Sequence, residues 1–316
     1  MAVYVNTNIS SLNGRRYLNN VQNSLTTTYQ RLSSGMRINS AKDDAAGLQI
    51  ADRLTTQING LNQGNRNTND AIALAQTMEG ALDETTNMLQ KIRTLAVQAS
   101  NGTNSAEDRK ALQQEVNSLS SEVTRIAKQT KFGGYTVLNG KQAAQGNPNS
   151  LIGADGKVTF QVGANNGDQI EFNIGEDAFT LTGLAKMAGI DVKDNVQAAG
   201  AAGGAGIAKT NGAVDATWTI STAEGAKLTL ANIDKMIAKV DSKRADLGAL
   251  QNRLESSIRN QANVAANQAD ARSRIRDADF AEESAALSQQ SIIQQAATSM
   301  LMQANSRPQL ALSMLG

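Results

Sequence analysis

The sequence predicts a mainly α-helical protein: a long antiparallel helical rod, with coiled-coil-like terminal arms and a helix-bundle core. This rod is expected to carry a β-hairpin and a small outer insertion of strands and loops. The chain of 316 residues has only two prolines, the residue that breaks helices from within. Aromatic residues make up 3%, so aliphatic side chains must supply the interior. Those aliphatic residues recur at helical spacing through most of the chain.

The terminal arms, residues 1–43 and 272–316, are amphipathic. The residues expected to make assembly contacts are Val5, Ile9, Leu12, Leu25, Leu32, Phe280, Leu287, Leu301, Leu312 and Leu315. Burial of so few apolar side chains does not offset the entropy lost when either arm becomes ordered. We therefore expect the arms to be disordered in the monomer and helical once neighbouring chains cover them. Such arms are a device for polymerisation.

In three stretches between the arms, apolar residues recur at helical spacing and form a continuous apolar seam along each expected helix. The first extends from Leu48 to about Ser100, and Asn101-Gly102 then supplies a stop signal with a glycine for a left-handed C-cap. Ser105-Ala106-Glu107-Asp108 begins the second stretch with a capping-box pattern. The third lies between Leu230 and Ile258. The three helices can bury their apolar seams most simply by packing on one another.

Asn65 and Thr68 interrupt the first seam and have two interpretations. They can mark a solvated stretch of a long helix, or they can be buried polar residues that fix axial alignment at a cost in stability. The solvated interpretation is favoured here, since the face that they occupy is not known from the sequence.

The hydrophobic period changes after the second helix. Val158, Phe160 and Val162 alternate with polar residues, as do Ile170, Phe172 and Ile174. Asn166-Gly167 lies midway and suits a tight turn, so residues 158–174 are expected to form a β-hairpin.

The expected domain division follows these patterns. Residues 44–178 and 225–271 form the helical rod domain between the arms. Residues 179–224, rich in Ala and Gly and containing Trp218, form a small outer domain that projects and is weakly constrained.

Composition excludes several kinds of chemistry. The chain has no histidine and no cysteine, which removes Ser-His-Asp and Cys-His catalysis, ordinary zinc sites and disulfides. A net charge of +1 argues against a nucleic-acid binder. No leader peptide and no membrane span are expected. No catalytic, cofactor-binding or metal-binding residue is predicted.

Two motifs could suggest a site, and both have a simpler explanation. Residues 203–210, GGAGIAKT, approximate a phosphate-binding loop, but alanine replaces the glycine before the lysine and a flexible loop explains the stretch. Carboxylates gather at Asp43-Asp44 and at Asp277, Asp279, Glu282 and Glu283 without calcium-loop spacing. Helix caps, helix-dipole partners and ion pairs are their expected roles.

Several segments resemble the bacterial flagellin family. They are VNTNISSL at 5–12, LSSGMRINSAKDDAAGL at 32–48, QVGAN at 161–165, ARSRIRDADFA at 271–281 and QANSRPQ at 303–309. The resemblance implies a non-enzymatic, secreted subunit that polymerises into the extracellular flagellar filament used for swimming motility, after export in an unfolded state by the flagellar type III apparatus. It also implies an export chaperone, a distal cap and hook–filament junction proteins as partners. The alternative is a junction-type adaptor, a class that resembles flagellin at its ends.

One further segment resembles the helix that the flagellin-sensing Toll-like receptor of animal hosts binds. The candidate contacts are Gln90, Lys91, Arg93, Leu95 and, on the next helix, Glu115. Lysine at 91 and threonine at 94 stand where activating flagellins have arginine and glutamate, and lysine lacks the forked donors of arginine. Receptor activation by the monomer is expected to be weaker than that of the best agonists, and the filament is expected to be silent because this face is buried between neighbours. The simpler explanation is that Leu95 is a seam residue and Arg93 a solvated charge.

Overall fold

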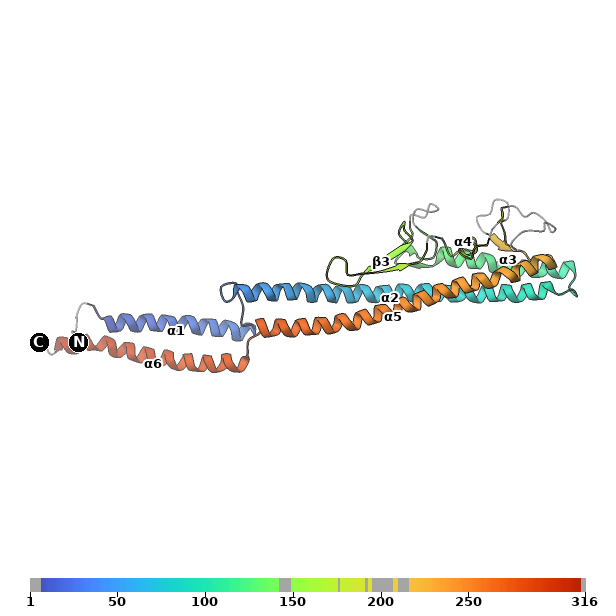
Figure 1. The fold of residues 1–316 in the computed structure, drawn as a ribbon. Helices are drawn as coiled ribbons and strands as arrows, with labels where there is room; N and C mark the ends of the chain where they lie inside the picture. Colours follow the sequence, from blue (N-terminus) through green and yellow to red (C-terminus); the bar gives the residue numbers. More distant parts are fainter. Residues whose placement is uncertain are drawn as a thin grey trace. The chain divides into compact units, whose positions relative to one another are not determined.

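The computed structural model describes residues 7–141, 149–175, 177–190, 193–194, 207–209 and 216–313, with side chains in the last helix described as far as Ser306. Helices dominate this part of the chain (Figure 1). They are α1 (Ile9–Ser34), α2 (Ala45–Ser100), α3 (Ala106–Gln129), α4 (Leu181–Met187), α5 (Ala223–Arg276) and α6 (Phe280–Ser313). The predicted mainly α fold class is confirmed.

The chain divides into two compact units, each assembled from distant segments. One comprises residues 1–59 and 263–316, and the other comprises residues 60–262. Helices α2 and α5 contribute residues to both. The division predicted at residues 43, 178, 224 and 271 stays a prediction.

In the second unit, α2, α3 and α5 share one hydrophobic core. The buried side chains include Leu82, Leu89 and Ile92 of α2, Val116 and Val123 of α3, and Ile233, Val240 and Leu254 of α5. An ion pair joins Asp83 to Arg244 at 2.8 Å, and Gln251 donates to Glu79 at 2.8 Å. The three predicted seams thus pack on one another, as expected.

The start of α3 follows the predicted capping box. The Ser105 hydroxyl accepts from the Asp108 amide at 3.1 Å, and the Asp108 carboxylate accepts from the Ser105 amide at 2.9 Å. The hydroxyl and the amide of Ser105 together lower the pKa of the Asp108 carboxyl group. Two backbone amides at the start of α3, those of Ser105 and Asp108, therefore have hydrogen-bond partners.

The end of α2 lies where predicted, but it is closed in another way. Gly102 does not adopt a left-handed conformation. Instead, the Arg109 guanidinium donates to the carbonyls of Ala99 at 2.9 Å and Asn101 at 3.0 Å, and Asn104 Nδ2 donates to the Gln98 carbonyl at 2.7 Å. Side chains from the start of α3 and the loop before it thus satisfy the last carbonyls of α2.

Thr68 is buried completely, so the solvated interpretation is wrong for this residue. Its hydroxyl donates to the carbonyl of Gly64 at 2.7 Å, within its own helix. Asn65 is half-buried.

The predicted hairpin is present, with β3 (Lys157–Gln161) antiparallel to β4 (Gln169–Asn173). Its connection is longer than the tight turn expected at Asn166-Gly167, because the paired residues Gln161 and Gln169 enclose a loop of residues 162–168. The Asp168 carboxylate closes this loop by accepting from the Asn165 amide at 3.0 Å. Helix α2 meets the loop at two glycines. A Cβ atom on Gly64 would lie 1.9 Å from the Val162 carbonyl oxygen, and one on Gly60 would lie 2.6 Å from Ala164.

The remaining strands are short. β1 (Lys131–Phe132) pairs with β2 (Tyr135–Thr136), and β6 (Ile207–Lys209) lies between β5 (Lys193–Asp194) and β7 (Ala216–Trp218). Segment 179–224 also contains the helix α4, which the expected mixture of strands and loops did not include. Leu181, Leu184, Trp218 and Ile220 are buried in the same core as α2, α3 and α5. The prediction of a weakly constrained segment is wrong for these residues.

Candidate functional site

Helices α1 and α6 pack against each other; we call them the arm pair (Figure 1). On each helix the more sheltered side chains recur at intervals of three and four residues, the spacing of a coiled-coil seam. This seam comprises Ser11, Gly14, Leu18, Val21, Leu25, Thr28 and Leu32 of α1, and Glu283, Leu287, Gln290, Gln294, Ala297, Leu301 and Ala304 of α6. Four of the predicted assembly residues, Leu25, Leu32, Leu287 and Leu301, therefore lie within the subunit's own seam.

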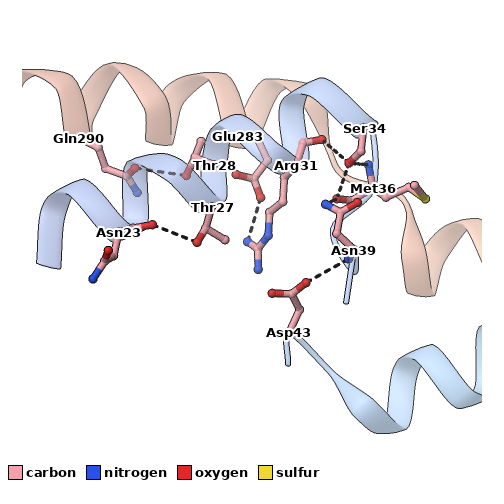
Figure 2. Close-up of polar contacts among 10 residues, drawn as sticks. All are labelled: Asn23, Thr27, Thr28, Arg31, Ser34, Met36, Asn39, Asp43, Glu283 and Gln290. Carbon is pink, nitrogen blue, oxygen red and sulfur yellow. Dashed lines mark hydrogen bonds and ion pairs between the residues drawn. The ribbon is translucent and has the colours of Figure 1, made fainter. Parts of the chain in front are cut away.

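Polar contacts cross this seam at defined points (Figure 2). The hydroxyl of the buried Thr28 donates to Gln290 Oε1 at 3.2 Å. One turn further along α1, Arg31 Nη1 pairs with Glu283 Oε1 at 3.1 Å. Near the other end of α1, Asn8 Nδ2 donates to the carbonyl of Ala304 at 2.7 Å.

The end of α1 lies beside the junction between α5 and α6. We call this place, formed by segments 35–38 and 275–278, the backbone crossing. Gly35 adopts the left-handed conformation, with φ of 68°, that ends α1. The amides of Arg37 and Ala278 donate to the carbonyls of Arg276 at 2.7 Å and of Gly35 at 3.0 Å. The Arg37 guanidinium adds a bond to the carbonyl of Ile275 at 2.7 Å. Hydrogen bonds thus join the end of α1 to the junction between α5 and α6.

Acidic residues around the crossing act on the backbone. Asp43 Oδ2 accepts from the Ser40 amide at 2.9 Å, the Ser40 hydroxyl at 3.0 Å and the Asn39 amide at 3.1 Å. These bonds, that of the Ser40 amide foremost, lower the pKa of the Asp43 carboxyl group. Asp44 accepts from the Gly47 amide at 2.9 Å at the start of α2, and Asp279 accepts from the Ala281 amide at 2.8 Å at the start of α6. The expected capping role is confirmed for Asp44 and Asp279, whereas Asp43 accepts from loop residues that precede it.

Outside the seam, the arm pair exposes large apolar side chains on several sides. Ile9 is 57% exposed, Leu12 54%, Phe280 62%, Ile292 66% and Met300 71%. Three of these, Ile9, Leu12 and Phe280, are predicted assembly residues. Val5 and Leu315 lie outside the described residues, as does the side chain of Leu312. The sequence did not distinguish residues of the seam from exposed residues outside it, because helical spacing alone does not show which side of a helix faces its partner.

The candidate receptor residues lie on α2 and α3. Gln90, Lys91, Arg93 and Glu115 are exposed, whereas Leu95 is half-buried against the core. Arg93 is not a free charge: its Nε donates to Asp234 Oδ1 of α5 at 2.7 Å, which raises the pKa of Arg93. Asp234 was missed because it is 141 positions away in the chain.

Two kinds of feature are absent among the described residues: groups of three or more carboxylates that could hold a metal ion, and helices that are both long and apolar enough to cross a membrane. Within the stretch that resembles a phosphate-binding loop, residues 207–209 are strand β6, and residues 203–206 and 210 lie outside the described part.

Comparison with known proteins gives a consistent result. Residues 5–143 match the bacterial flagellin N-terminal helical region, and residues 230–315 match the bacterial flagellin C-terminal helical region. Flagellin C of Vibrio cholerae serotype O1 is 38% identical over 381 residues, and polar flagellin B/D of Vibrio parahaemolyticus serotype O3:K6 is 40% identical over 383; each match covers 100% of both chains. A putative flagellar hook-associated protein from Vibrio parahaemolyticus has a TM-score of 0.52 at 13% identity, covering 74% of this chain and 100% of its own, a likeness of fold alone.

Proposed function

The chain belongs to the bacterial flagellin family, and from that membership we propose that the arm pair is the surface through which each subunit joins its neighbours. The protein is a structural subunit of the flagellar filament used for motility, and it is not an enzyme. Flagellins polymerise, and their filament is extracellular. The alternative of a junction-type adaptor is not favoured, because the relatives matched along the full chain are flagellins.

The observation that carries the proposal is the exposed apolar surface of the arm pair. Ile292 and Met300 of α6, and Ile9 and Leu12 of α1, are not covered by the described part of the subunit. A helix that is apolar on several sides requires cover on all of them. Other copies of the chain would supply that cover in a filament, and an unassembled subunit would hold its arms disordered.

A seeded-elongation assay tests this proposal. Sheared filaments are mixed with monomer, and growth is followed by electron microscopy and sedimentation. Ile292→Asp is expected to stop growth, because a charge would be buried between subunits. Ile292→Met keeps the apolar surface and serves as the matched control. Normal growth of the aspartate variant, or equal loss in both variants, would contradict the proposal.

Export and its partners follow from the same proposal. Apolar arms that await neighbours need protection before assembly, which supports an export chaperone in the cytoplasm. We expect the chain to leave unfolded through the flagellar type III apparatus and to assemble beneath a distal cap, above the hook–filament junction proteins. A strain without the export apparatus should retain the protein in the cytoplasm; its appearance in the medium would contradict this route.

Recognition by the flagellin-sensing Toll-like receptor is a second proposed interaction. Its support is the exposed set Gln90, Lys91 and Glu115, together with Arg93 held by Asp234. Reporter cells should respond to monomer and not to filament, with less response to Lys91→Ala, Leu95→Ala and Glu115→Ala. Lys110→Ala, which removes an exposed charge elsewhere on α3, is the control. Unchanged potency in all three variants would refute the assignment.

A further inference from the structure

We propose that three contacts across the arm pair, Gly14 with Leu301, Thr28 with Gln290 and Arg31 with Glu283, set the axial register of α1 against α6. The inference rests on the proposed role of the arms in assembly and extends it. It assigns these residues to alignment within the subunit, separate from the outward-facing residues that meet neighbours.

A repeating seam does not fix its own register. Side chains at intervals of three and four face the partner again after seven residues, so a slip of one heptad returns seam residues to seam residues. Such a slip displaces one helix by about 10 Å along the other. Contacts that do not repeat along the seam are needed to select one alignment.

The first of these contacts is a match of shape. A Cβ atom on Gly14 would lie 3.1 Å from Leu301 Cδ1, so the glycine makes room for the leucine. Glycine weakens the interior of a helix, and its presence in α1 is explained by this close approach. A slip of one heptad would place Leu301 opposite Val21 in one direction, or Gly14 opposite Gln294 in the other.

The other two contacts are polar and lie at the crossing end of the pair, where Figure 2 shows the side chains pointing toward each other. Thr28 is only 4% exposed, and its hydroxyl donates to Gln290 at 3.2 Å. The Glu283 side chain is 12% exposed and pairs with Arg31 at 3.1 Å. In a slipped register this sheltered carboxylate would lose its cation, which is more costly than the pair itself is favourable.

Register matters for what lies outside the seam. Ile9 and Leu12 on one helix, and Ile292 and Met300 on the other, can present one constant pattern only if the two helices keep one alignment. A slip of a heptad would move the two halves of that pattern apart by about 10 Å. Neighbouring subunits would then meet mismatched surfaces.

Charge reversal in the full chain tests the ionic contact. In seeded elongation, Arg31→Glu and Glu283→Arg should each slow growth by about tenfold or more, because each brings like charges together in a sheltered place. The double variant should recover part of the rate; its exchanged charges oppose the helix dipoles, which prevents full recovery. Lys110→Glu makes the same charge change on an exposed side of α3, outside the arm pair, and should grow normally.

Cross-linking reads the register directly, and the absence of native cysteine leaves only introduced thiols to react. Gln294 Nε2 lies 3.5 Å from Gln22 Oε1, so Gln22→Cys with Gln294→Cys should give an intramolecular product with a short bis-maleimide in filaments. Gln22→Cys with Leu287→Cys, one heptad away, should not. Adding Arg31→Glu should reduce the first product.

The outcomes separate the two proposals. Any of three outcomes would overturn the register proposal and leave assembly by the arms standing. Arg31→Glu could grow at the wild-type rate with the 22–294 product intact, or the double variant could grow no faster than the slower single variant. The third outcome is equal cross-linking of both cysteine pairs in the wild-type background. Failure of the unmodified chain to elongate on seeds would instead contradict the proposed function itself.

Discussion

At the scale of single residues, polar side chains in this chain mostly satisfy backbone groups. Asp44 and Asp279 accept from amides in the first turns of α2 and α6, and the sequence predicted these roles because a cap acts within a few positions. Arg109 and Asp234 were not predicted. Arg109 binds carbonyls of the preceding helix, and Asp234 binds an arginine 141 positions away, so their partners depend on how helices pack.

The Asp43 carboxylate makes the loop between α1 and α2 sensitive to acid. Its pKa is lowered in the folded state, so the stability that it contributes is present above its unfolded pKa of about 3.9 and is lost as the pH falls through the folded value. We expect Asp43→Asn to speed hydrogen exchange of the 39–44 loop at neutral pH and to match the wild type in acid. Mass spectrometry at each pH measures this. Asp52→Asn, which removes an exposed carboxylate on α2, is the control and should leave exchange of the 39–44 loop unchanged.

At the scale of elements, local patterns predicted more than the junctions between elements. The strands of the hairpin follow from strict alternation, but its loop does not, because residues 162–168 are arranged against α2. Helix α4 was missed because seven residues are too few for a helical period to emerge. A glycine within a long helix, such as Gly64, is the one signal that could have indicated the close approach of the loop.

Two glycines of α2 should respond to alanine with opposite signs. Gly64→Ala would place a methyl group against the Val162 backbone and is expected to destabilise the fold by about 1–3 kcal/mol. Gly80→Ala meets no atom within 4 Å, and it should stabilise the fold by about 1 kcal/mol, since alanine favours the helix. Urea unfolding followed by circular dichroism compares them. Equal effects of both changes would show that the loop does not hold this position against α2.

At the scale of the whole molecule, the sequence predicted that both ends of the chain form arms, because apolar residues there follow a helical period. The pairing of the two arms shows which residues contact each other, and a helical period cannot predict this. Thr28 and its partner Gln290 are separated by 262 positions in the sequence, and Arg31 and its partner Glu283 are separated by 252. No local signal marks such partners, and only their packing reveals them.

Each arm should be necessary for growth and unnecessary for the core of α2, α3 and α5. We expect deletion of residues 1–40 or of residues 277–316 to abolish seeded elongation, because either deletion leaves one arm without its seam partner. The core helices should keep their far-ultraviolet circular dichroism. Elongation of either truncated chain at the wild-type rate would contradict this, and a collapse of the helical signal would show that the core depends on the arms.

The distance in sequence between Arg31 and Glu283 also has a consequence in time. Their 252 positions correspond to roughly 10 to 50 seconds of translation at the usual pace of a ribosome. For most of that interval α1 lies outside the ribosome and α6 has not been made. Every nascent chain therefore passes through a period in which half of its arm pair can meet only the arms of other copies, and a chain released early never leaves that period.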